Sequence, residues 1–219
     1  MASITRRALA GLALGLAAAA PAFAQDTLRV GYLGLVSHAP SFIAQERGYF
    51  ADEGITVELV NFNAAQPMAV AIASGDVDFG VTAISAGLIS LAEKDVIRVI
   101  GGALQEEAGI EGQKILVSKA AHDDGVTSPA DLAGRRFGLT TAGSSFHYMA
   151  HKIADGAGFA RDSLQLVPMQ GVPAVIAALR SGQIDAWSIV PNIATALSGS
   201  GDVVEIGNVS DYVENYQVT

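Results

Sequence analysis

The heptapeptide Ala-Ser-Gly-Asp-Val-Asp-Phe occupies residues 73–79, and a similar one, Arg-Ser-Gly-Gln-Ile-Asp-Ala, occupies residues 180–186. Each has the pattern of a helix end, a glycine stop and the first residues of a strand, because glycine commonly follows the last helical residue. The same offset of 107 residues, applied without gaps, brings further identical residues together. These are Arg29, Gly31, Ser37, Leu59, Val60 and Asp78, which fall on Arg136, Gly138, Ser144, Leu166, Val167 and Asp185. A constant offset predicts two similar lobes, joined near residues 109–118.

Strand and helix patterns alternate along both lobes. Strands are expected at residues 28–33, 56–62, 77–82, 96–100, 114–118, 136–140, 164–168 and 184–189. Helices are expected at residues 41–50, 68–73, 128–132, 144–156 and 174–179, with another beginning at Ser85. Strands that alternate with helices at this spacing indicate an α/β fold with a largely parallel sheet.

The first 24 residues have the pattern of a cleaved export signal. Arg6 and Arg7 precede an apolar run at residues 8–20, and Ala-Phe-Ala at residues 22–24 provides a small-x-small cleavage site. The run is shorter than the ~20 apolar residues that span a bilayer. The chain contains no cysteine, which excludes disulfides, thiol catalysis and a lipid anchor on cysteine. We therefore expect a free periplasmic protein that begins at Gln25.

The charge argues against nucleic acid as a partner. The formal net charge is −9, and cleavage would remove two of the 13 basic residues and none of the 22 acidic ones, which gives −11. Nucleic-acid binding depends on basic patches. A small anion remains compatible, because a pocket can be locally positive on an acidic protein.

The motifs of common catalytic sites are missing or incomplete. No Gly-x-Ser-x-Gly elbow or phosphate-binding loop is present. His147 and His151 have the i,i+4 spacing of two zinc ligands, but neither a catalytic Glu nor a third ligand accompanies them. We interpret them as partly exposed helix residues, with a minor ligand contact open for His147. We expect no catalytic residue, no metal and no cofactor.

Three helix starts, at residues 37–41, 82–85 and 143–145, follow the carboxyl ends of predicted strands. Ligands of open α/β sheets bind at that edge, and helix N-termini offer unpaired N–H groups and the positive end of a dipole. Ordinary N-capping explains each serine singly. Together the helix starts predict a cleft for a small polar or anionic group. Trp187, the only tryptophan, ends a strand, where core packing and a pocket wall are equally compatible with it.

Five motifs along the chain are Ser37-His38-Ala39-Pro40, Gly48-Tyr49-Phe50-Ala51-Asp52-Glu53-Gly54-Ile55, and residues 74–80, 128–136 and 182–187. Together they resemble motifs of the periplasmic substrate-binding proteins of nitrate, sulfonate and taurine ABC importers, and of the related binders of thiamine-pyrimidine precursors. The resemblance extends from Leu28 to about Gly207. It implies a two-lobed periplasmic-binding-protein fold of type II that closes around a small solute and delivers it to an ABC permease in the inner membrane.

The resemblance also implies where a ligand is contacted. The expected ligand-binding residues are Ser37, His38, Thr82, Ser85, Gly143, Ser144, Ser145, Trp187 and Asn192. Many relatives carry an acidic residue beside Pro191, where this chain has Asn192, so a ligand whose cation needs that carboxylate is disfavoured.

The resemblance further implies a longer chain. Relatives continue for roughly a hundred residues and return to the first lobe, in line with ordinary domain sizes. We therefore expect a signal peptide at residues 1–24 and an incomplete first lobe at 25–112 that lacks its C-terminal part. The second lobe is expected at 113–219, and it ends at residues 216–219 with the start of the strand that returns to the first lobe. The isolated chain is expected to associate and to bind ligand poorly, whereas the full-length protein is expected to be a monomer.

Two other functions remain open, because fold does not fix function. An enzyme on the same fold could act in pyrimidine or quinone-precursor metabolism, although the pyrimidine-synthesising relatives use a cysteine-rich motif. A ligand-sensing domain of a membrane receptor is the other alternative.

Overall fold

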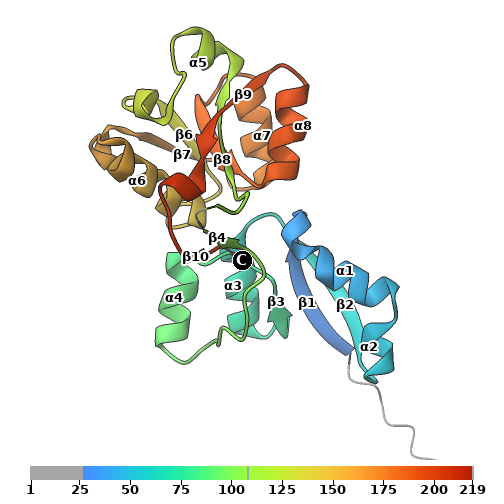
Figure 1. Cartoon of the computed structure of the whole chain (residues 1–219). Helices are drawn as coiled ribbons and strands as arrows, with labels where there is room; N and C mark the ends of the chain where they lie inside the picture. Colours follow the sequence, from blue (N-terminus) through green and yellow to red (C-terminus); the bar gives the residue numbers. More distant parts are fainter. Residues whose placement is uncertain (1–26, 108, 219) are drawn as a thin grey trace, which may run out of the picture.

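The computed structural model describes residues 27–107 and 109–218, so the predicted signal peptide lies outside the described residues. Two groups of elements are visible in Figure 1, and they confirm the two-lobed α/β fold. The first lobe has a three-stranded sheet in the order β2-β1-β3, and all its strands are parallel. Its elements are β1 (Thr27–Leu33), α1 (Ala39–Glu46), α2 (Tyr49–Asp52), β2 (Thr56–Phe62), α3 (Ala65–Ser74), β3 (Phe79–Gly80) and α4 (Ala86–Glu93).

The second lobe has a five-stranded sheet in the order β7-β6-β8-β5-β9. Its elements are β5 (Lys114–Ser118), α5 (Lys119–Asp123), β6 (Arg136–Leu139), α6 (Ser145–Ala157), β7 (Gln165–Pro168), α7 (Val172–Arg180), β8 (Ala186–Ile189), α8 (Pro191–Gly199) and β9 (Val203–Asn208). The segment expected to be helical at residues 128–132 forms a short 3-10 helix, Pro129–Leu132. β6, β7 and β8 are parallel, whereas β5 runs antiparallel to both β8 and β9. Figure 1 shows α6 on one side of this sheet and α7 and α8 on the other.

Two short strands connect the lobes. β4 (Gln105–Glu106) pairs antiparallel with β10 (Tyr216–Gln217), which brings Glu106 opposite Tyr216. Figure 1 shows this pair between the two groups of elements. The chain therefore passes between the lobes through two adjacent segments.

The internal repeat is also found in individual hydrogen bonds of the structure. The backbone N–H of Arg29 donates to the carboxylate of Asp78 at 2.7 Å, and that of Arg136 donates to Asp185 at the same distance. The N–H of each aspartate donates back to the carbonyl of its arginine, at 2.8 and 2.9 Å. In the first lobe these bonds join β1 to the residue just before β3, and in the second lobe they join β6 to the residue just before β8. The same pair of hydrogen bonds therefore connects two neighbouring strands in each lobe.

One predicted strand is absent. Residues 96–100 do not form a strand, although the offset of 107 places Val96 on Val203, the first residue of β9. β9 pairs with β5, which lies between β8 and β9. In the described part of the first lobe, no strand takes the place of β5 beside β3. The backbone of residues 96–100 therefore has no ladder to join, and this explains the difference.

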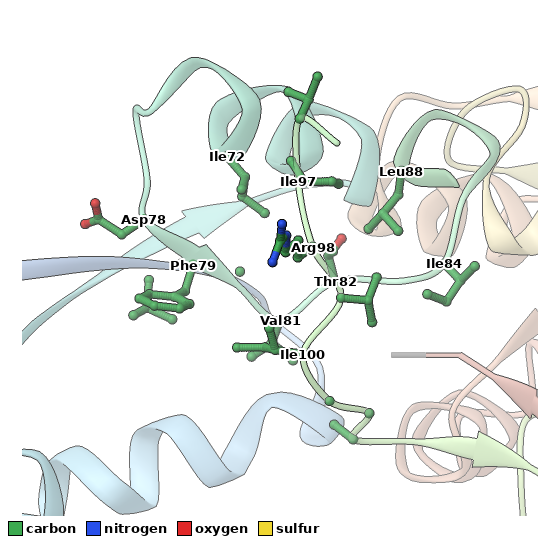
Figure 2. Close-up of a pocket in the computed structure, with 17 residues that line it drawn as sticks. Ile72, Asp78, Phe79, Val81, Thr82, Ile84, Leu88, Ile97, Arg98 and Ile100 are labelled. Carbon is green, nitrogen blue, oxygen red and sulfur yellow. The ribbon is translucent and has the colours of Figure 1, made fainter. Parts of the chain in front are cut away.

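A cavity of about 580 Å³, here called the first-lobe cavity, lies where that strand would be. Its lining includes residues 78–82 around β3 and residues 96–103. Figure 2 shows Phe79 and Val81 of the first segment and Ile97 and Ile100 of the second among the residues that line it. Phe79 is 45% exposed and Ile100 is 81% exposed.

The buried core is unequally divided between the lobes. One large cluster of buried residues surrounds the second-lobe sheet and includes Phe137, Ile153, Leu179 and Trp187. A much smaller buried cluster in the first lobe consists of Ala69, Leu88 and Ile97. Because buried apolar surface is the main favourable contribution to folding, the second lobe has the stronger basis for stability.

The two aspartates that occupy equivalent places in the lobes differ in burial and in hydrogen-bond partners, and this difference can be tested. Asp185 also accepts from the side chain of Arg136, and its own side chain is only 13% exposed, whereas Asp78 is exposed. We expect Asp185→Ala to lower the free energy of unfolding by about 2–3 kcal/mol, because hydrogen bonds to charged groups are worth more when buried. Asp78→Ala should cost about 1 kcal/mol or less. Urea unfolding of both variants measures this, and equal losses would contradict it.

The exposed apolar side chains that line the first-lobe cavity, such as Phe79 and Ile100, lead us to expect self-association of the chain, since exposed apolar surface promotes it. We expect a double variant, Phe79→Ser with Ile100→Ser, to shift the chain toward monomer in sedimentation-velocity experiments. Val70→Ser is a suitable control, because Val70 is 63% exposed but does not line this cavity. A wild-type chain that is monomeric at all concentrations would disprove the prediction.

Candidate functional site at the junction of the lobes

The carboxyl ends of the parallel strands face each other across the junction of the lobes. Loops that follow β2 and β3 in the first lobe meet loops that follow β6 and β7 in the second. The Ala86 N–H donates to the Gly143 carbonyl at 2.9 Å, and the Gln66 side-chain amide donates to the Ala142 carbonyl at 3.0 Å. A third contact joins the N–H of Val172 to the Asn63 carbonyl at 3.4 Å. This edge is where open α/β sheets hold ligands.

Two of the predicted helix starts contact each other here. Ser85 caps α4, and its hydroxyl oxygen accepts from the Leu88 N–H at 3.2 Å. Ser144 caps α6 in the same way and accepts from the His147 N–H at 3.4 Å. Ser145 is the first residue of α6 and is buried. Because a capping hydroxyl uses only its oxygen, its hydrogen is still available to a ligand.

A cavity of about 470 Å³, here called the junction cavity, lies beside these helix starts. Its lining comes from both lobes and from β10. The lining residues are Ile84, Ser85, Ala86, Ile89, Gly143, Ser144, His147, Tyr148, His151 and Tyr216. The structure thus brings together Ser85, Gly143 and Ser144 of the predicted ligand-binding set. The aromatic members Tyr148 and Tyr216, whose ring centroids are 4.8 Å apart, are not in the predicted ligand-binding set. The sequence predicts a return strand that opens at Tyr216, but it does not indicate that this side chain reaches the cavity.

Ser37 and His38 lie after β1 and do not line this cavity, but each has a buried polar atom with no hydrogen-bond partner among residues 27–107 and 109–218. They are the Ser37 hydroxyl oxygen and the His38 Nε2. Thr141, just after β6, and Ser188, in β8, have such atoms too. A buried polar group without a hydrogen bond costs about 1–3 kcal/mol, so such groups call for a specific explanation. Binding of a polar ligand at the strand ends would provide such an explanation. Thr141 is not among the predicted ligand-binding residues, although its position at the end of a predicted strand can be read from the sequence.

His38 is fully buried, and burial lowers its pKa to about 4. Its Nδ1 accepts from the backbone N–H of Leu33 at 3.2 Å. A neutral imidazole that accepts at Nδ1 must carry its hydrogen at Nε2. The unpartnered Nε2 of His38 is therefore a hydrogen-bond donor at neutral pH.

The remaining predicted residues lie apart from the junction cavity. Thr82 lines the first-lobe cavity, and its hydroxyl donates to the Ala65 carbonyl at 3.5 Å. Trp187 is fully buried in the second-lobe core, with its ring centroid 5.4 Å from that of Phe146. Asn192 is exposed near the start of α8.

His147 and His151 lie close together on α6, with ring centroids 4.5 Å apart. The Nδ1 of His147 already accepts from the Gly143 N–H at 2.9 Å. No group of three metal-ligating side chains occurs in the described residues. These observations favour two ordinary helix histidines over a metal site.

We expect His147 and His151 to be dispensable for any zinc or iron content of the purified protein. Elemental analysis of wild type and His151→Ala should show the same substoichiometric metal, because two imidazoles without a third ligand bind a metal weakly. Stoichiometric metal that disappears in the variant would overturn this expectation.

None of the helices within residues 27–107 and 109–218 is long and apolar enough to cross a membrane. Two α/β lobes that meet at their strand ends and are linked by two short strands define the fold class of the periplasmic binding proteins. The chain belongs to the NMT1/THI5-like family, which it matches over residues 36–218.

Individual relatives agree with this assignment. The taurine-binding periplasmic protein of Escherichia coli K12 is 28% identical over 184 residues, which are 84% of this chain and 54% of that protein. A 4-amino-5-hydroxymethyl-2-methylpyrimidine phosphate synthase of Aspergillus parasiticus is 38% identical over 69 residues, 32% of this chain and 20% of that enzyme. The alkanesulfonate-binding protein SsuA from Xanthomonas axonopodis pv. citri, solved with MOPS bound, has the same fold. Its TM-score is 0.69 at 23% identity, covering 83% of this chain and 60% of that one. The chain thus spans a little over half the length of these binding proteins.

Proposed function

We propose that this chain is the solute-binding component of an ABC importer and captures a small anionic solute of the sulfonate, taurine or nitrate type in the periplasm. The observation that carries the proposal is the contact of two helix starts from different lobes, where the Ala86 N–H meets the Gly143 carbonyl. A site built from both lobes can be opened and closed by lobe movement. Such movement is how a carrier takes up and releases a solute.

The chemistry of the junction suits an anion. Helix N-termini favour negative charge, and α4 and α6 both begin there. The Ser85 and Ser144 hydroxyls add neutral donors, because each uses only its oxygen as a helix cap. No Asp, Glu, Lys or Arg is among the described residues that line the junction cavity, although the whole chain has a net charge of −9. An anion there meets dipoles and neutral donors without carboxylate repulsion.

Relatives support the carrier role and its partner. The E. coli relative is a taurine-binding periplasmic protein, and the Xanthomonas structure is an alkanesulfonate-binding protein. By analogy, the partner of this chain is a permease of the inner membrane, and the protein is exported by the signal predicted at residues 1–24.

An enzyme of pyrimidine synthesis is the second candidate, because the Aspergillus synthase matches 69 residues of the chain. The absence of cysteine argues against it, since the resemblance associates those enzymes with a cysteine-rich motif. A thermal-shift screen of sulfonates, nitrate, pyrimidines and aromatic acids separates the two candidates. Stabilisation by a pyrimidine alone would exclude the anionic solutes, and chemical conversion of that pyrimidine would then favour the enzyme over a carrier of pyrimidines.

The serines at the start of α6 provide a sharper test. In protein purified from the periplasm of cells that express the whole gene, Ser144→Ala with Ser145→Ala should weaken binding of taurine or an alkanesulfonate. We expect the Kd to rise about fivefold or more per lost hydrogen bond in isothermal titration calorimetry.

Loss of a helix cap also lowers stability, so a matched variant is needed. Ser118 caps α5, where its hydroxyl oxygen accepts from the Ala121 N–H at 3.1 Å, and it does not line the junction cavity. Ser118→Ala should lower the melting temperature to a similar extent and leave the Kd unchanged. An unchanged Kd in the double variant would remove Ser144 and Ser145 from the site.

A further inference from the structure

Two hydrogen bonds in series meet at Gly143. Its carbonyl accepts from the Ala86 N–H of the first lobe at 2.9 Å, and its own N–H donates to the Nδ1 of His147 at 2.9 Å. Gly143 has a φ of +76°, which a residue with a side chain rarely adopts. A Cβ added at Gly143 would lie 3.3 Å from the Ala86 Cβ. The junction therefore depends on holding this glycine in one conformation.

His147 holds Gly143 from within α6. The Ser144 hydroxyl oxygen accepts from the His147 N–H at 3.4 Å, while the His147 ring accepts from the Gly143 N–H. This reciprocal arrangement resembles a capping box, in which a side chain at the third helical residue reaches back to a backbone N–H. A glutamate or glutamine usually has that role. A histidine in its place makes the contact dependent on protonation, because Nδ1 accepts a hydrogen bond only when it carries no hydrogen.

We propose that His147 is a positioning residue of the lobe junction, and that its unprotonated Nδ1 makes the contact between the lobes sensitive to pH. When the ring is protonated, its Nδ1–H and the Gly143 N–H are both donors and the hydrogen bond is lost. Gly143 is then no longer held in one conformation, and its carbonyl no longer stays in place to accept from the Ala86 N–H.

The surroundings of His147 determine the direction of the effect. His151 and Tyr148 lie beside it on α6 and Tyr216 on β10. The first-lobe residues that line the junction cavity are Ile84, Ser85, Ala86 and Ile89, and none of them is charged. Burial, followed by the charge of His151, lowers the pKa of His147. Burial raises the pKa of Tyr216, so its hydroxyl stays neutral. The hydrogen bond from the Gly143 N–H to the His147 Nδ1 is thus fully formed above the ordinary histidine pKa of about 6.5. It is lost as the pH falls through the lower pKa that His147 has when this bond is formed.

The test needs no solute, so it stands apart from the proposed function. In wild-type protein, ¹⁵N imidazole shifts should show His147 as the Nε2–H tautomer at neutral pH. Amide exchange, corrected for intrinsic rates, should show Gly143 and Ala86 losing about fivefold or more in protection as His147 becomes protonated. His147→Ala should show this loss at every pH. His147→Gln keeps an acceptor that does not titrate, so protection should be restored and should no longer depend on pH.

Two controls separate this role from a general effect on folding. His122→Gln removes a histidine of α5, outside the junction cavity, and should leave both amides unchanged. His151→Gln removes a neighbouring charge and should raise the pKa of His147 without breaking its bond. Full protection in His147→Ala, an Nδ1–H tautomer in the wild type, or a pH dependence that persists in His147→Gln would each overturn the proposal. If His147→Ala does not fold, the wild-type titration and the glutamine variant still decide.

Discussion

The parallel direction of the central strands determines where a site can form in this molecule. Parallel strands have all their carboxyl ends at one edge, so every connecting loop that precedes a helix begins at that edge. The first lobe has three such strands and the second lobe has β6, β7 and β8. Because the lobes meet edge to edge, the helix starts capped by Ser85 and Ser144 come together although they are far apart in sequence. The meeting of these helix N-termini at the junction is a consequence of strand direction rather than of any single motif.

Much of the fold could be predicted from the sequence because the signal is duplicated. The offset that joins Asp78 to Asp185 joins two copies of one βαβ pattern, and the strands at 56–62 and 114–118 have the bounds expected from periodicity. The prediction was wrong for residues 96–100, because periodicity describes a segment alone, whereas a strand also requires a neighbour for its backbone groups. The antiparallel strand β5, which provides that neighbour in the second lobe, comes from outside the repeated unit.

The candidate site was less predictable than the fold. Position at a strand end singled out Ser85, Gly143 and Ser144, which line one cavity in the structure, and their binding of a ligand stays a prediction. The contribution of Tyr216 depends on β10 returning to the junction, where its hydroxyl donates to the Ile84 carbonyl at 2.9 Å. The role of His147 depends on a rotamer that turns its ring back toward Gly143. The resemblance predicts a return strand at Tyr216, but the cavity that this side chain reaches and the direction of the His147 ring are set by tertiary packing, and neither leaves a pattern in local sequence.

The pairing of β4 with β10 makes the second lobe an insert with adjacent ends. The chain leaves the first lobe at Glu106 and comes back at Tyr216, directly opposite. Between these points lies a segment with its own sheet and its own buried core. Such a segment can be excised, expressed alone or transplanted into a related host without redesigning its termini, because the two cuts fall side by side. The architecture is modular in this sense, because the second lobe has both of its ends at one place and a buried core of its own.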